Sequence, residues 1–286
     1  MTAAARLREL LAAGELVVAP GAYDCLTARM VQDAGFPAVY MTGAGTAASL
    51  GYPDYGLLTM SEMAGNARRI AAAVTVPVIA DADTGFGNEL NVVRTVHEYT
   101  AAGVAALHIE DQVFPKRCGH LDSKQVIDAD AFVGKVRAAA ESRPADGPLL
   151  IARTDARAVL GFEEAVERAN RALAAGADVA FVEAPQTPEE VADVPRRVEG
   201  PCLLNVVAGG KTPDIALRRA ADIGYQIAIV PVLLLAAILA AGDAALADLA
   251  ATGRHPSSVP VTPVAEIFRR AGSASWDAVR ERYGAA

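Results

Sequence analysis

Cysteine is scarce in this sequence, and its three positions, Cys25, Cys118 and Cys202, lie far apart. An odd number of cysteines without a C-x-x-C spacing argues against a disulfide framework and against a cysteine-rich metal site. We therefore expect a reducing, cytoplasmic setting. Residues 1–11 also lack the apolar segment that a signal peptide needs, which agrees with this expectation.

Long apolar segments and clusters of positive charge are equally rare. The longest apolar run, residues 227–241, contains Pro231 and is too short to span a bilayer comfortably, so we expect a buried strand followed by a buried helix. The net charge is −8, and no run of Lys or Arg contradicts this acidic balance. We therefore expect neither nucleic acid nor membrane as a partner. An acidic substrate is still compatible, because a local group of cations can dominate one pocket.

The composition is that of a globular protein, with 52% apolar and 21% charged residues in a chain of 286. Short, largely apolar, β-branched runs alternate with segments rich in Ala, Arg and Glu. Strands that are apolar on both faces are typical of a parallel sheet covered by helices. The predicted strands are 16–19, 38–42, 78–81, 105–110, 149–153, 179–183, 202–205 and 226–229.

Eight strand–helix units in a row predict a (β/α)8 barrel of the TIM type, with a doubly wound open sheet as the alternative. The helical patterns between the strands include 26–34, 61–73, 90–102, 131–142, 162–175 and 213–221. Several of them end in Ala-Gly, where glycine can adopt the left-handed conformation that closes a helix. Because no low-complexity linker interrupts the chain, we predict one domain over 1–286, with a core at about 15–250 and a helical tail at about 253–286.

Polar residues occur at the C-terminal end of strand after strand. Six such ends carry Thr42-Gly43, Asp81 with Asp83, Glu110-Asp111, Arg153-Thr154-Asp155, Glu183 and Asn205. A single ending of this kind would be explained by a helix cap. Six of them predict a shared pocket, because the C-terminal rim of a barrel is where active sites are built.

Asp81 and Asp83 are the first candidates for a metal site. If the strand end is extended, residues two apart share one face, and two close carboxylates repel each other unless a cation or a proton lies between them. Mg²⁺ prefers a few carboxylates with water and substrate oxygens, whereas Zn²⁺ would favour His or Cys. The alternative is that Asp83 caps the helix that begins near Asn88.

The segment Lys116-Arg117-Cys118-Gly119-His120 is the strongest candidate for chemistry. A lone cysteine is usually a small core hydrophobe, which is how we interpret Cys25 and Cys202. Cys118 instead lies in a polar loop with two cations upstream, which would favour the thiolate and attract an anionic substrate. Arg153, at the end of a buried strand, needs a partner: a substrate carboxylate, or else Glu183 or Asp155.

With these residues in place, the sequence resembles the isocitrate lyase/phosphoenolpyruvate mutase superfamily over about residues 17–232. No one of the shared segments is specific alone, but their order and number are. The segments are Ala22-Tyr23-Asp24, 41–45, 51–54, 81–87, 108–112, 116–120, 152–156 and 181–184.

The resemblance implies a barrel with an exchanged C-terminal helix, in a homotetramer built as a dimer of dimers. It implies Mg²⁺, with Mn²⁺ as an alternative, held at Asp81 and Asp83 with support from Asp54 and Glu110. It also implies that a loop closes over a small carboxylic acid and excludes water. The implied substrate-binding residues are Thr42, Gly43, Ala44, Gly119, His120, Arg153, Glu183 and Asn205.

Within the superfamily, the Cys-Gly-His loop resembles that of the carbon–carbon lyases. The implied reaction is a retro-aldol or retro-Claisen cleavage of a 2-hydroxy acid to a 2-oxo acid and a carboxylate enolate. Cys118 would protonate the enolate carbon as a general acid. Tyr23 and a metal-bound water are the alternatives for the base that removes the hydroxyl proton.

One departure from the pattern bears on the substrate. Methylisocitrate lyases typically carry an arginine after the last barrel strand, whereas this chain has no cation in 230–236. A 2-alkylmalate, 2,3-dimethylmalate or oxaloacetate therefore fits better than a tricarboxylate. The segment 112–120 is also similar to that of carboxyvinyl-carboxyphosphonate phosphorylmutases. This similarity keeps P–C bond chemistry open as an alternative, beside an oxaloacetate hydrolase.

The apolar residues from 230 onward and Trp276 predict an oligomer.

Overall fold

The structure, a computed structural model, describes residues 1–121 and 123–284. Eight parallel strands close into a barrel in sequence order, which confirms the predicted fold and excludes the open sheet. Each strand pairs with the next, and β8 returns to pair with β1. The strands are β1 (Val17–Ala22), β2 (Val39–Met41), β3 (Val78–Asp81), β4 (Ala106–Glu110), β5 (Leu149–Thr154), β6 (Val179–Val182), β7 (Cys202–Asn205) and β8 (Ile227–Val230).

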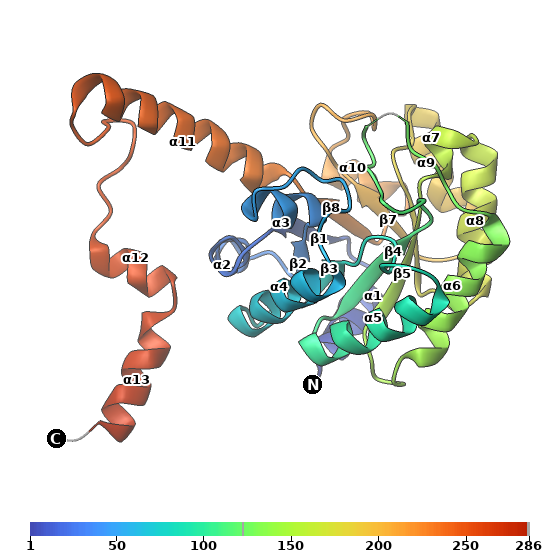
Figure 1. The fold of residues 1–286 in the computed structure, drawn as a ribbon, viewed down its shortest axis with the longest axis horizontal. Helices are drawn as coiled ribbons and strands as arrows, with labels where there is room; N and C mark the ends of the chain where they lie inside the picture. Colours follow the sequence, from blue (N-terminus) through green and yellow to red (C-terminus); the bar gives the residue numbers. More distant parts are fainter. Residues whose placement is uncertain (122, 285–286) are drawn as a thin grey trace. The chain divides into compact units, whose positions relative to one another are not determined.

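Helices follow the strands and cover the outside of the barrel (Figure 1). The helices before β8 are α1 (Ala3–Ala12), α2 (Cys25–Asp33), α3 (Gly43–Ser49), α4 (Met60–Ala73), α5 (Glu89–Ala102), α6 (Ala129–Ser142), α7 (Ala156–Val159), α8 (Phe162–Ala174), α9 (Pro188–Arg197) and α10 (Leu217–Asp222). Gly35, Gly103 and Gly176 all have positive φ where a helix ends, which confirms the predicted Ala-Gly stops.

Local sequence sets where these helices begin. Asp24 and Thr59 each form a reciprocal capping box, at the starts of α2 and α4 respectively. Asn88 caps α5, and its side chain accepts a hydrogen bond from Leu90 N–H at 3.2 Å. Asp83 therefore does not cap this helix, and its carboxylate is available to the site described below.

Apolar side chains fill the barrel and close its N-terminal end. Leu7 of α1 is fully buried and packs in one cluster with Val17, Ala105 and Leu149 near the starts of their strands. Burying one such leucine contributes roughly 1.5–3 kcal/mol. With this end covered by α1, the C-terminal rim is where the barrel presents its polar groups.

The chain divides into two compact units, Met1–Leu233 and Leu234–Ala286. The second is helical, with α11 (Leu233–Thr252), α12 (Val264–Arg270) and α13 (Ser273–Tyr283). The prediction of a single domain with a tail from about residue 253 stays a prediction.

The apolar run after β8 does not form the buried helix that we expected. The strand part is buried, but α11 has no buried residue. The helix is apolar on all sides, so no single face separates a covered from a solvated surface. By length and composition alone its 20 residues, with a mean hydropathy of 1.9, are enough to cross a membrane, whereas we expected an apolar run too short for this.

Candidate active site

The polar strand ends converge on one cavity at the C-terminal rim of the barrel. Ten of the predicted site residues line it: Thr42, Ala44, Asp54, Asp81, Cys118, Gly119, His120, Arg153, Glu183 and Asn205. Five further residues complete the wall, namely Tyr40, Lys116, Val207, Pro231 and Val232. Asp83, Glu110 and Gly43 contact the lining residues Lys116, Arg153 and Asp81 respectively, whereas Tyr23 is not part of the lining.

Asp81 is held in place by backbone donors. Its Oδ2 accepts a hydrogen bond from Gly43 N–H at 3.1 Å, and its Oδ1 accepts one from Asp83 N–H at 2.9 Å. Asp83 has a φ of 45°, so the chain turns sharply there instead of continuing the extended strand that we expected. The approach of Gly43 is so close that any side chain at this position would collide with the Asp81 carboxylate.

The acidic residues of the rim differ in their protonation equilibria. Burial, opposed by Lys116 and reinforced by Asp81, raises the pKa of Asp83 to about 6. Burial also raises the pKa of Glu110 well above its usual value. For Asp81 burial acts in the same direction, but His108, Lys116 and Arg153 outweigh it and hold its pKa below the usual value.

Lys116 has a different place from the one its sequence position suggested. Its buried ammonium is bonded to Asp54 and lies 3.0 Å from Asp83 Oδ1. Arg117 is exposed, with its guanidinium carbon 6.0 Å from the centre of the Tyr55 ring. The expectation that both cations act on Cys118 is therefore wrong, because one is neutralised by carboxylates and the other faces outward.

The donor set at this rim suits a hard cation. Among the described residues, six carboxylates of the site (Asp54, Asp81, Asp83, Glu110, Asp155, Glu183) accompany three cations (Lys116, Lys124, Arg153). Glu110 Oε1 is buried without a hydrogen-bond partner. Within 1–121 and 123–284 no three His, Cys, Asp or Glu side chains converge as a complete protein ligand set. Mg²⁺, which usually keeps several waters and needs only one or two carboxylates, fits these residues.

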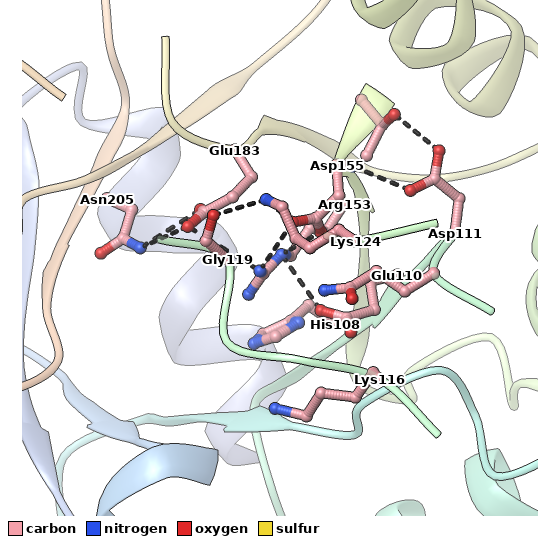
Figure 2. Close-up of polar contacts among 12 residues, drawn as sticks. His108, Glu110, Asp111, Lys116, Gly119, Lys124, Arg153, Asp155, Glu183 and Asn205 are labelled. Carbon is pink, nitrogen blue, oxygen red and sulfur yellow. Dashed lines mark hydrogen bonds and ion pairs between the residues drawn. The ribbon is translucent and has the colours of Figure 1, made fainter. Parts of the chain in front are cut away.

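Arg153 is the central cation of the site (Figure 2). Its Nε lies 2.9 Å from Asp155 Oδ2 and 3.1 Å from Glu110 Oε2, and its Nη2 lies 3.8 Å from Glu183 Oε1. The predicted pairing with Asp155 or Glu183 is confirmed, and Glu110 is an additional partner. Burial alone would lower the pKa of Arg153, but these carboxylates raise it well above its usual value, so the group stays charged.

Cys118 lies half-buried at the cavity, in the loop that joins β4 to α6. Burial raises the pKa of its thiol, and nearby Asp54 adds to this, although a hydrogen bond from the His120 backbone and the charge of Arg153 act in the opposite direction. Our expectation of a thiolate is therefore wrong. A protonated thiol is the form that can donate a proton.

His120 connects the same loop to two strand ends. Its Nδ1 accepts a hydrogen bond from Lys211 N–H at 3.0 Å, which leaves the proton of the neutral ring on Nε2. Nε2 lies 3.2 Å from Glu183 Oε1 and 3.4 Å from Asn205 Nδ2. Because burial lowers the pKa of His120, the neutral ring with Nε2–H donating to Glu183 is favoured.

Two tyrosines lie near the site, and only one of them lines the cavity. Tyr23 packs against Gly45 and does not line the cavity, so its assignment as a base stays a prediction. Tyr40 does line it, with its hydroxyl 2.8 Å from His108 Nε2 and 3.4 Å from Asp81 Oδ2. Sequence reasoning missed Tyr40 and His108. The available signal was a polar tip inside each of two otherwise apolar strands.

Known proteins are similar to this chain over most of its length. A family model described as phosphoenolpyruvate phosphomutase matches residues 7–250. The 2,3-dimethylmalate lyase of Eubacterium barkeri is 49% identical over 232 residues, which are 81% of this chain and 80% of that protein. The 2-methylisocitrate lyase of Aeropyrum pernix is 47% identical over 247 residues, which are 86% and 80% of the two chains.

Solved structures show the same fold. One of a 2,3-dimethylmalate lyase has a TM-score of 0.95 at 43% identity and covers 100% of this chain and 97% of the other. An oxaloacetate acetylhydrolase with 3,3-difluorooxalacetate has a TM-score of 0.95 at 39% identity, covering 100% and 98%. A phosphonopyruvate hydrolase with oxalate and Mg²⁺ has a TM-score of 0.87 at 33% identity, covering 99% of each chain.

Proposed function

The chain belongs to the phosphoenolpyruvate mutase/isocitrate lyase superfamily, and from this premise we propose that it is a Mg²⁺-dependent carbon–carbon lyase of 2-hydroxy acids. The observation that carries the proposal is that Cys118 and Asp81 line one cavity together with Arg153. A proton donor, an oxygen-rich cation site and a guanidinium thus face the same small space.

Asp81 and Asp83, with Asp54 and Glu110 in support, are the residues that would hold the metal ion. When bound, Mg²⁺ would offset the excess of carboxylates and lower the pKa of a coordinated substrate hydroxyl. Glu110 Oε1 is buried without a hydrogen-bond partner, and burial raises the pKa of both Asp83 and Glu110, so a cation bound beside them would stabilise their ionised forms.

The protein groups have separate tasks in the cleavage. Arg153 would hold the carboxylate on which negative charge develops as the carbon–carbon bond breaks. A base, for which Tyr23 and a water molecule are the alternatives, takes the hydroxyl proton. The electron pair of the carbon–carbon bond passes to the carbon next to that carboxylate and gives an enolate, while the hydroxyl carbon becomes the carbonyl of a 2-oxo acid. Cys118 would then transfer its thiol proton to the enolate carbon, as a protonated thiol can.

The lining of the cavity limits the substrate. Val207, Pro231 and Val232 are its apolar residues. Among the described lining residues, Lys116 already pairs with Asp54 and Asp83, and Arg153 already pairs with Glu110 and Asp155, so no further lysine or arginine is available for an additional substrate carboxylate. This supports a substrate with a small or alkyl side group, such as 2,3-dimethylmalate or another 2-alkylmalate.

A substrate panel with Mg²⁺ tests the proposal. We expect 2-oxo acid release from 2,3-dimethylmalate or a related acid, and a fall of about 10²-fold or more in kcat for Cys118→Ser. Equal rates for the two proteins would remove the role of Cys118. Oxalate from oxaloacetate would indicate the hydrolase, and a C–P signal in phosphorus NMR from a phosphoenolpyruvate-type substrate would indicate the mutase; either one without lyase turnover would refute the lyase.

We also propose that the protein acts as a cytoplasmic homo-oligomer, a dimer of dimers with exchanged C-terminal helices. The support for assembly is α11, whose apolar residues are not buried in the single chain. An uncovered apolar helix of this length is typical of an interface. The support for the location is the three separate thiols, of which Cys202 is buried.

A further inference from the structure

Buried side chains hold the backbone on both sides of Cys118. On the N-terminal side, the Gln112 carboxamide pairs with both peptide groups of Arg117: its Nε2 donates to Arg117 O at 2.8 Å, and its Oε1 accepts from Arg117 N–H at 3.0 Å. Gln112 is 1% exposed, so water does not compete for these bonds.

On the C-terminal side, Lys124 holds Gly119. Its buried ammonium donates to Gly119 O and, at 2.6 Å, to Asp155 Oδ1 (Figure 2). Asp155 in turn accepts hydrogen bonds from Arg153 Nε at 2.9 Å. Gly119 is thus held, through Lys124, by the same Asp155 carboxylate that orients Arg153.

The two holding residues belong to a fixed part of the loop. Gln112 pairs with Val126 in a short antiparallel bridge, and Val113 N–H donates to Gln125 O at 2.9 Å. Ile127 N–H donates to Asp111 O at 2.8 Å. The base of the loop is therefore anchored to β4, and its reach toward the cavity is set by contacts on Arg117 and Gly119.

We propose that Gln112 and Lys124 are positioning residues for the Cys118 thiol. The inference rests on the proposed function, since it concerns the geometry of that proton transfer. Neither side chain lines the cavity, so both act through the peptide groups that flank Cys118. Misplacing a reacting group by about 1 Å can lower a rate by 10²-fold.

Kinetics separate positioning from a merely structural role. We expect Gln112→Leu and Lys124→Met to lower kcat on the best acid of the panel by about 10- to 100-fold and to change KM less than threefold. Lys124→Arg, which keeps a donor to Gly119 O and Asp155, should recover part of the loss. Gln125→Leu is the matched control, because Gln125 is exposed in the same loop and its expected rate is that of the wild type.

The stereochemistry of the product is a second test of the positioning role. In D₂O, cleavage of 2,3-dimethylmalate delivers one deuteron to C2 of propionate, on one face if the thiol is fixed. We expect the wild type and Gln125→Leu to give one configuration, and Gln112→Leu and Lys124→Met to give a mixture of both. A single configuration in all four proteins, with kcat within twofold, would overturn the proposal.

Thiol chemistry decides the question without turnover. Iodoacetamide labelling of the Cys118 peptide, followed by mass spectrometry, should be about tenfold faster in the two variants than in the wild type and Gln125→Leu. Unchanged labelling in folded variants would overturn the positioning role. If Gln112→Leu or Lys124→Met does not fold, Gln112→Asn and Lys124→Gln replace it with the same expectation. A wild type that cleaves none of the acids would refute the proposed function, whereas the labelling comparison would still decide the positioning.

Discussion

Replacing Gly119 with alanine would add one methyl group at the point where the loop meets the barrel. A Cβ on Gly119 would lie 2.7 Å from Glu183 Cδ and closer still to Glu183 Oε1 and Arg153 Nη2. Carbon atoms in contact are normally about 3.5–4.0 Å apart. Gly119 is not in the left-handed region, so the effect of the substitution is steric and not a backbone effect.

The size of the clash sets the expected loss. To restore normal contact the loop must retreat by about 1 Å, because Glu183 and Arg153 are fixed by their own ion pairs. Such a retreat costs about 10² in rate through misplacement, and full loss of the acid would cost up to about 10⁴. We expect kcat to fall by about 10²- to 10³-fold, which is about 3–4 kcal/mol in activation free energy.

The assay is steady-state release of the 2-oxo acid with Mg²⁺ present, combined with urea unfolding. Gly134→Ala is the matched control, because Gly134 lies in α6 with no heavy atom within 4 Å of an added Cβ. That control should keep its rate and gain up to about 1 kcal/mol in unfolding free energy. A Gly119→Ala protein within threefold of the wild-type kcat would show that close docking of the loop is not required.

Further expectations concern the thiol, the metal, the central arginine and assembly. Because burial raises the pKa of Cys118, kcat should hold through neutral pH and fall only at a pH above about 8.5, at which an ordinary thiol is half ionised; a pH–rate profile of Cys118→Ser should lack this limb. EDTA should abolish turnover and added Mg²⁺ restore it, and Asp83→Asn should weaken Mg²⁺ binding in calorimetry. Arg153→Met should lower the unfolding free energy in urea by about 3–5 kcal/mol, because the buried Glu110 loses its ion-pair partner and Asp155 keeps only Lys124. Light scattering should give a multiple of 29.6 kDa, and a monomer mass at micromolar protein would contradict the proposed oligomer.

Much of the barrel could be predicted because each strand has a recognisable pattern in its own local sequence. A strand such as β4 is buried along its whole length, and an apolar β-branched run between two helical patterns suffices to mark it. The position of Arg153 at the end of β5 likewise followed from strand order alone. The prediction that the helix after β8 is buried was wrong. Composition shows that an apolar helix needs a surface to pack against, but not whether the same chain provides that surface.

The loop between β4 and α6 was less predictable, because its contacts are made over long distances along the chain. Lys116 meets Asp54 across 62 residues, and Lys124 meets Asp155 across 31. Proximity in sequence suggested that Lys116 would act on Cys118, but the more favourable partner for a buried ammonium was a pair of carboxylates. Side-chain direction in a loop follows from such competition, which no local pattern encodes.

The division of labour between barrel and loop has an evolutionary consequence. Asp81, Glu110 and Arg153 lie on strands fixed by the hydrophobic core, whereas Cys118, the proposed acid, lies in the loop between β4 and α6. Changes in that loop can therefore alter the fate of a reactive carbanion while folding is left intact. New reactions could arise in such a scaffold when this one loop changes while the proposed metal-binding residues on the barrel stay the same.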